Sequence, residues 1–287
     1  MVNFSNRSEK ESEMLTISNS FNKFWWILPY FFALISEASA QLPKLSDSEL
    51  QWLGEQIFNN ECASQFECLT SWNPGERFPS LGIGHFIWYQ QKQIEPFEET
   101  FPELLALFNE RGIVLPDWLS GGRNANAPWN SRKQFNAQLQ SSQMRELRQI
   151  LATTKPVQVE FISRRLYQSI NEIIKQFPTG RQQIIKDKVI NLANSQTPYG
   201  LYALIDYLNF KGTGLNSRER YLKKGWGLLQ VLQEMQHSNP TLENFVAAAG
   251  YVLERRVTNA PPQREEQRWL PGWKNRLQTY LPVQRTE

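Results

Sequence analysis

Apolar residues recur at helical spacing soon after residue 45. Ser46 and Glu49 form a Ser-x-x-Glu capping box, which is typical of a helix start. The apolar positions that follow share one helical face and are Leu50, Leu53, Ile57 and Phe58. The run Asn59-Asn60-Glu61-Cys62 closes the pattern. We therefore predict a helix that starts after Ser46 and ends near Cys62.

A pattern of strand type follows a turn at Asn73-Pro74-Gly75. It predicts a strand over Ser80–Tyr89, whose alternate side chains point to opposite sides. One side then carries Leu81, Ile83, His85 and Ile87, and the other carries Ser80, Gly82, Gly84, Phe86 and Trp88. Two interpretations of the second side are open. Either a ligand approaches the glycines and the two rings stack on a sugar, or the segment is a bulged hairpin packed on its own core.

Helical patterns separated by short breaks occupy most of the remaining chain. We predict helices near Phe101–Phe108, over most of residues 131–194 with a break at 177–180, and at residues 218–235, at residues 242–256 and after Pro271. Thr197 is predicted as an N-cap, with Pro198 at the first helical position. Much helix with one small sheet predicts a single α+β domain over residues 41–287, with a helical insertion around residues 131–194.

The N-terminal segment has the features of a secretory signal peptide. Lys23 precedes the apolar run Phe24–Ser36, and Ala38-Ser39-Ala40 ends the segment. Cleavage after Ala40 is predicted, which makes residues 1–40 the leader and the protein periplasmic or secreted. The alternative is an uncleaved membrane anchor, although the apolar run is short for a spanning helix. After the leader we expect no membrane span.

Composition narrows the classes of partner and cofactor. The net charge of +3 is too small to predict nucleic-acid binding. His85 and His237 are far apart and no Cys/His cluster is present, so we predict neither a metal site nor a cofactor. Cys62 and Cys68 can form a disulfide only if the helix ends soon after Cys62, and two free thiols are the alternative.

Glu61 is the leading candidate for chemistry because of its place on the first helix. Ile57, Gly54 and Leu50 precede it by 4, 7 and 11 residues, so they lie on the same, largely apolar face. A carboxyl at the end of such a face is partly desolvated, which favours its protonated form and lets it donate a proton. Gly54 also leaves room for something to lie against the helix. The alternative is a solvated residue at a helix end.

The segment from Glu61 through Leu69-Thr70 to Ser80-Leu81-Gly82-Ile83-Gly84-His85 resembles the catalytic segment of phage-type lysozymes. That family carries a catalytic Glu at a helix end, followed by a β-hairpin with a Thr-Ile-Gly-x-Gly-His signature. Residues 203–207 with Gly212-Thr213-Gly214 look like a later helix of the family, and residues 255–264 weakly resemble its Arg-rich closing segment. The resemblance implies a lysozyme-like fold with a hairpin beside the catalytic helix, and peptidoglycan as the partner.

The resemblance also implies roles for single residues. Glu61 falls at the acid and protonates the leaving oxygen, and Ser80 replaces the signature Thr and positions a water. Thr70 stands where the family has its second carboxylate, so Glu76 is the substitute that stabilises the oxocarbenium-like state or activates water. Glu67 is a distant second candidate for the acid. The expected substrate contacts are Thr70, Gly82, Gly84, His85, Phe86 and Trp88, with His85 bracing the hairpin.

These roles predict an enzyme that cleaves peptidoglycan at the β-1,4 bond after N-acetylmuramic acid. Two alternatives are open. A lytic transglycosylase needs only one Glu because the substrate's own hydroxyl attacks, and Thr70 in place of a carboxylate favours it. A non-catalytic protein of the envelope would keep the fold and bind peptidoglycan without cutting it.

Overall fold

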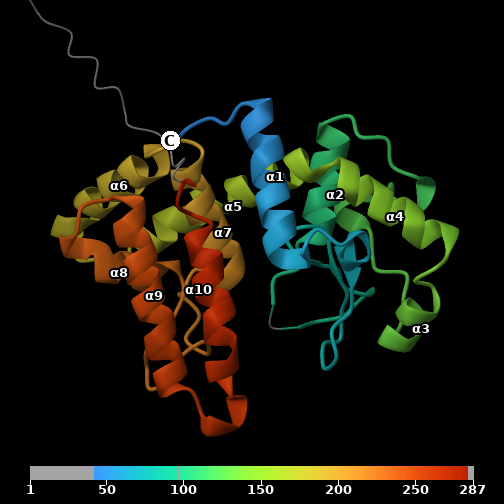
Figure 1. Ribbon diagram of the computed structural model, residues 1–287. Helices are drawn as coiled ribbons and strands as arrows, with labels where there is room; N and C mark the ends of the chain where they lie inside the picture. The colour runs from blue at the N-terminus through green and yellow to red at the C-terminus, as the bar shows by residue number, and fades with distance from the viewer. Residues whose placement is uncertain (1–41, 96, 284–287) are drawn as a thin grey trace, which may run out of the picture. The chain divides into compact units, whose positions relative to one another are not determined.

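The computed structural model describes residues 42–95 and 97–283, all of which fall in the unit of residues 40–287 (Figure 1). The leader predicted at residues 1–40 lies outside the described residues. Within the part of the chain that is described, no helix is both long and apolar enough to cross a membrane.

The unit is mainly helical with one small antiparallel sheet, as the sequence predicts. The strands are β1 (Thr70–Ser71), β2 (Ser80–Leu81) and β3 (Phe86–Ile87). The α-helices are α1 (Asp47–Cys62), α2 (Phe101–Glu110), α3 (Arg132–Ala137), α4 (Ser142–Thr153), α5 (Lys155–Ile174), α6 (Thr179–Asn194), α7 (Tyr199–Lys211), α8 (Leu228–Glu234), α9 (Leu242–Asn259) and α10 (Leu270–Gln278).

The predicted first helix is confirmed at both ends. The Ser46 hydroxyl accepts a hydrogen bond from the Glu49 amide (3.3 Å), and the Ser46 amide donates to the Glu49 carboxylate (2.8 Å), which completes the capping box. The helix ends at Cys62 because Ala63 takes a left-handed conformation, with φ of 47°. This early end lets the chain turn back, and Cys62 and Cys68 form a disulfide with a Cα–Cα distance of 5.5 Å.

We expect this disulfide to contribute measurably to stability. Replacing Cys62 and Cys68 together by Ser should lower the free energy of unfolding by about 2 kcal/mol, because the bond restricts a short loop of the unfolded chain. Urea unfolding with and without dithiothreitol measures the effect. The reductant should destabilise the native chain and leave the double variant unchanged. Equal stability of the two oxidised proteins would contradict the prediction.

The predicted strand over Ser80–Tyr89 is wrong, because the chain reverses inside it. β2 and β3 pair antiparallel, with Ser80 opposite Ile87, and β1 pairs with the other side of β2. The turn between them runs through Gly82 (φ +69°) and His85 (φ +49°). Positive φ angles of this kind are incompatible with an extended strand. The alternation of side chains expected across residues 80–89 therefore does not hold.

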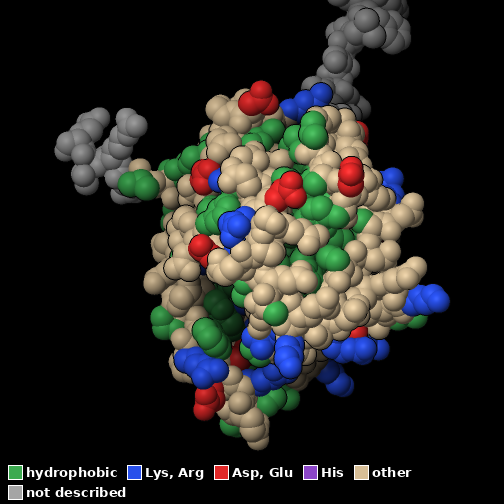
Figure 2. Space-filling model, turned by 90° about the vertical axis from the view of Figure 1, so that its right-hand side faces the viewer, with side chains coloured by type: hydrophobic (Ala, Val, Ile, Leu, Met, Phe, Trp, Pro, Cys, Tyr) green, Lys and Arg blue, Asp and Glu red, His purple; other side chains and the backbone are tan. Residues whose placement is uncertain are grey.

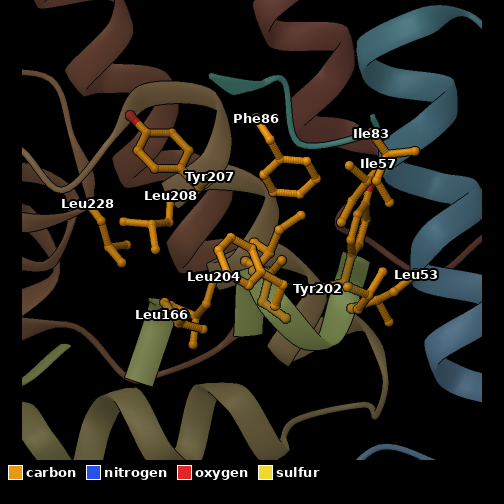
Figure 3. Packing of buried hydrophobic residues seen from close by; sticks show 14 of the residues in the cluster. Leu53, Ile57, Ile83, Phe86, Leu166, Tyr202, Leu204, Tyr207, Leu208 and Leu228 are labelled. Atoms are coloured by element: carbon orange, nitrogen blue, oxygen red, sulfur yellow. The ribbon is translucent and has the colours of Figure 1, made fainter. Parts of the chain in front are cut away.

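The core joins side chains of the hairpin to side chains of the surrounding helices. Figure 3 shows Leu53 and Ile57 of α1 beside Ile83 of the β2–β3 turn and Tyr202 of α7. α1 packs along α5, and a Cβ added at Gly54 would lie 2.9 Å from the Lys155 Cβ. The room predicted beside Gly54 is thus occupied by the start of α5.

Two helix predictions near the C-terminus are corrected. α7 begins at Tyr199, with Pro198 rather than Thr197 at the N-cap position. The helix predicted over residues 218–235 is only α8, Leu228–Glu234. The preceding segment is held as a loop because Gly227 and Gly214 approach too closely for side chains, a Cβ at Gly227 lying 2.2 Å from the Gly214 nitrogen. The helices predicted near residues 101–108, at 242–256 and after Pro271 are present as α2, α9 and α10.

The molecular surface carries charges of both signs. Figure 2 views the unit from the side of α2 and α4, where Lys and Arg side chains gather along the lower edge and most acidic side chains lie above them. The net charge of the whole chain is only +3.

Candidate active site

Glu61 lies in the last turn of α1, where three other segments meet its carboxylate. Its side chain is 12% exposed. Oε1 accepts hydrogen bonds from Asn209 of α7 (3.2 Å) and from Arg276 of α10 (2.5 Å), while Oε2 lies 3.5 Å from His85 Nδ1. The apolar surroundings expected for this carboxyl are therefore wrong. Partners that are 148 and 215 residues away in sequence supply a polar setting.

Arg276 is fixed by a second, deeper carboxylate. Asp206 is 0% exposed and accepts hydrogen bonds from Arg276 Nε and Nη2 at 2.8 Å each. Burial lowers the pKa of Arg276, but Asp206 and Glu61 outweigh it and hold that pKa well above its ordinary value. Arg276 is therefore a permanent cation. Because Asp206 compensates its charge, Glu61 lies beside an ion pair and not beside an isolated cation.

Tyrosine hydroxyls and an amide complete the network around Asp206. Tyr280 donates to Asp206 Oδ2 (2.6 Å) and is fully buried. Burial, followed by the charge of Asp206, raises the pKa of Tyr280 well above its ordinary value, so this hydroxyl stays a donor. Asn60, the neighbour of Glu61, donates to Tyr202 (2.7 Å). The end of α1 is thus tied to α7 and α10 through two adjacent residues.

The β2–β3 turn brings His85 to Glu61 and is itself anchored by α5. The Ile83 amide donates to Gln158 Oε1 (2.9 Å), and Gln158 Nε2 donates to the Leu151 carbonyl (2.6 Å). Gln158 is fully buried, whereas the His85 side chain is 36% exposed. A buried side chain with both ends bonded fixes the turn, and with it the position of the imidazole.

Four of the predicted substrate contacts belong to the core instead. A Cβ at Gly82 would lie 2.4 Å from Gln158 Oε1, and one at Gly84 would lie 2.5 Å from Phe86 Cζ. Phe86 and Trp88 are 1% and 0% exposed. The atoms that approach these glycines are therefore the protein's own, and neither ring can line a sugar groove. The alternative interpretation, a hairpin packed on its own core, is the correct one.

Thr70 and Ser80 are also buried, at 3% and 5% exposure. The Thr70 hydroxyl accepts a hydrogen bond from Arg148 Nε (2.7 Å), so the predicted substrate contact of Thr70 is wrong. The Ser80 carbonyl accepts from the Ser71 hydroxyl (3.2 Å), which binds β1 to β2. The role of the Ser80 hydroxyl in positioning water stays a prediction.

The two other candidate carboxylates do not contact Glu61 among the described residues. Glu67 is exposed on a short 3-10 helix, Phe66–Leu69. Glu76 lies in the β1–β2 loop and lines a pocket whose other walls come from residues 72, 77, 90–93 and 130–132. Glu61 is not part of that pocket. The role of Glu76 as the second carboxylate therefore stays a prediction that no contact supports.

Cys62, Cys68 and His85 place their potential metal-binding atoms within 4.8 Å of one another. Both sulfur atoms are joined in the disulfide, and a metal requires thiolates. In this oxidised state the cluster cannot act as a metal centre.

Lys211, the last residue of α7, has an unusual setting near Glu61 that the sequence did not indicate. Its Nζ lies 3.8 Å from the centroid of the Phe210 ring and 3.6 Å from that of the Trp273 ring. Burial, reinforced by Arg256 and Arg276, lowers the pKa of Lys211 to about 6, although Glu266 and Glu61 act in the opposite direction.

The lowered pKa of Lys211 predicts that this residue destabilises the folded protein by an amount that depends on pH. From about pH 6 up to the ordinary value of 10.5, the unfolded chain holds the Lys211 proton more tightly than the folded chain, so stability rises with pH over that window. Lys211→Met should therefore raise the melting temperature more at pH 6 than at pH 9.5. The exposed Lys175→Met is the control and should change little at either pH. The same increase at both pH values for Lys211→Met would contradict the prediction.

Sequence reasoning missed Asp206, Asn209 and Arg276, although they form most of the site. Asp206 lies inside the segment 203–207 that the resemblance singled out, so a buried acid in an apolar helix was the available signal. Nothing in the sequence near Arg276 indicated a link to Glu61. No protein-family model, no curated protein sequence and no solved structure matches this chain.

Proposed function

We propose that this protein cleaves the glycan strands of peptidoglycan at the β-1,4 bond after N-acetylmuramic acid, with Glu61 as the general acid. The observation that carries the proposal is the setting of Glu61. Its carboxylate lies at the end of a helix and is 12% exposed, with one oxygen held by Arg276 and Asn209 and the other beside His85. The resemblance of residues 61–85 to phage-type lysozymes supports the same role.

The two oxygens of Glu61 have different tasks in this proposal. Oε1 is occupied by two donors, which fix the direction of the carboxyl group. Oε2 carries the proton that passes to the leaving glycosidic oxygen. Fixing the acid in advance reduces the entropic cost of reaching the transition state. Asp206 supports this arrangement from below by holding Arg276 in place.

A second candidate, lytic transglycosylation, is favoured by the absence of another reactive carboxylate near Glu61 in the described part of the chain. Thr70 is buried against Arg148, and Glu76 lines a different pocket. Asp206 is fully buried and committed to Arg276 and Tyr280. In a lytic transglycosylase the substrate's own hydroxyl attacks, so one acid suffices.

Digestion of purified sacculi, followed by mass spectrometry of the soluble products, tests the proposal. A reducing N-acetylmuramic acid end indicates hydrolysis, and a 1,6-anhydro end indicates transglycosylation. Either product supports glycan cleavage at this bond. Sedimentation of the protein with sacculi without release of fragments would overturn the proposal in favour of a non-catalytic envelope protein.

The proposal includes export, because the substrate lies outside the cytoplasm. The predicted leader at residues 1–40 supports a periplasmic or secreted protein. The Cys62–Cys68 disulfide also fits an oxidising compartment.

A further inference from the structure

The pocket around Glu76 is lined in part by the β1–β2 loop and has a volume of about 410 Å³. It is large enough to hold a small ligand. Its walls are polar and carry charges of both signs, and they comprise Trp72, Glu76, Arg77, Gln90, Gln91, Lys92, Gln93, Asn130, Ser131 and Arg132. The acid proposed above, Glu61, contributes no atom to these walls.

Glu76 brings an unsatisfied acceptor to this pocket. Its Oε2 is buried and has no hydrogen-bond partner, and no cation of the described residues pairs with its carboxylate. Its backbone is nevertheless fixed, because its carbonyl accepts from the Trp72 indole nitrogen (2.9 Å). Buried carboxylate oxygens without a donor are costly and rare in folded proteins. The other oxygen, Oε1, is not buried in this way and also has no partner among the described residues, so a ligand that donates a hydrogen bond to Oε1 would compensate the charge of the carboxylate.

Arg132 presents the opposite charge in the same pocket. Its Nε donates to the Trp72 carbonyl (2.6 Å), while its two terminal nitrogens have no partner among the described residues. The guanidinium is therefore oriented, and its outer edge is available for a carboxylate. Trp72 is itself buried, with its ring 5.7 Å from that of Phe135. One rigid residue thus positions both Glu76 and Arg132.

Opposite charges that line one pocket would normally pair with each other, yet Glu76 and Arg132 do not. Lys92, in the same wall, also forms no ion pair with a described residue. A ligand with an ammonium and a carboxylate on one carbon satisfies both sides at once. A simple anion would leave Glu76 unpaired, and a simple cation would leave Arg132 unpaired.

We propose that this pocket binds a zwitterionic amino-acid head group, with the ammonium on Glu76 and the carboxylate on Arg132. The inference rests on the proposed function for the source of this ligand. In peptidoglycan, the free end of the diamino acid of a stem peptide carries such a group. The pocket then holds the peptide of a wall fragment while Glu61 acts on the glycan.

Three small probes of matched length test the charge requirement by calorimetric titration of the whole protein. The probes are meso-diaminopimelate, pimelate, which lacks the ammonium groups, and 1,5-diaminopentane, which lacks the carboxylates. We expect meso-diaminopimelate to bind at least about tenfold more tightly than either of the others, a difference of about 1.4 kcal/mol. Equal binding of pimelate or of the diamine would overturn the proposal, as would no binding of any probe.

Two variants assign the binding to this pocket. Glu76→Gln and Arg132→Gln should each weaken meso-diaminopimelate binding about tenfold or more, because each leaves one ligand charge unpaired. Arg145→Gln, an exposed arginine outside the pocket, is the matched control and should bind normally. Melting temperatures show that each variant is folded. Unchanged binding by both pocket variants would overturn the proposal.

A disaccharide tripeptide that ends in meso-diaminopimelate identifies the source of the ligand. Binding at least as tight as that of the free amino acid supports the wall peptide, and binding of the free amino acid alone overturns that source. Glu61→Gln separates the proposal for catalysis from the proposal for the pocket. Loss of wall lysis with retained probe binding supports both, whereas lysis by native protein that binds no probe refutes only the pocket.

Discussion

Replacing Glu61 by Gln should reduce the release of soluble fragments from sacculi by about 10²–10⁴-fold, the usual cost of removing a general acid. Gln keeps the size of the side chain and its hydrogen bond to Arg276, but it has no proton to give to the leaving oxygen. The fold should persist, because Asp206 still compensates the charge of Arg276. Turbidity of a sacculus suspension gives the rate, and circular dichroism checks the fold.

Glu67→Gln provides the matched control, since it removes a nearby but exposed carboxylate by the same substitution. It should lyse walls at the native rate. If Glu61→Gln retains native lysis, Glu61 is not the acid. If Glu67→Gln loses lysis and Glu61→Gln does not, Glu67 is the acid and Glu61 is not.

Local signals in the sequence predicted the helix that carries Glu61. The capping box at Ser46 and the apolar positions after it involve residues within a few turns of one another, so spacing alone was sufficient. The run Asn59–Cys62 predicted an end near Cys62 but not the left-handed turn at Ala63 that brings Cys68 back, which is why the state of the two cysteines was open. The glycines left a hairpin open as one of two interpretations and the resemblance favoured it, whereas strand alternation treats a turn at Gly82–His85 as extended chain.

The rest of the candidate site could not be predicted, because its contacts join distant parts of the chain. Arg276 and Asn209 reach Glu61 only after α7 and α10 have packed beside α1. Periodicity reports which face of a helix is buried, but it does not report which helix covers that face. The prediction of an apolar setting for Glu61 was wrong for this reason, because the facing helices present polar side chains.

Distant contacts also explain why the prediction that Phe86 and Trp88 line a sugar groove was wrong. Aromatic residues beside glycines are compatible with sugar stacking and with a tightly packed core, and only the neighbouring atoms distinguish the two. Here Gln158 of α5 and the Phe86 ring itself fill the space next to Gly82 and Gly84. His85 is the hairpin residue that reaches Glu61.

Asp206→Asn should be the most destabilising single substitution in the site, at about 3–5 kcal/mol of unfolding free energy. The Asp206 side chain is fully buried and satisfies Arg276 through two hydrogen bonds and Tyr280 through one. An amide removes the buried counter-charge and leaves Arg276 with Glu61 as its remaining anionic partner among the described residues. Urea unfolding measures the loss. Asp187→Asn, the same change at an exposed position of α6, should stay within about 0.5 kcal/mol of the native protein.

Tyr280→Phe keeps this prediction testable if Asp206→Asn fails to fold. It removes one hydrogen bond to the buried carboxylate and leaves the ion pair with Arg276 in place, so it should cost about 1.5–3 kcal/mol. The expected order of loss is therefore Asp206→Asn, then Tyr280→Phe, then Asp187→Asn. A Tyr280→Phe protein as stable as the native one would contradict the prediction and would mean that the hydrogen bond from Tyr280 to Asp206 does not stabilise the fold.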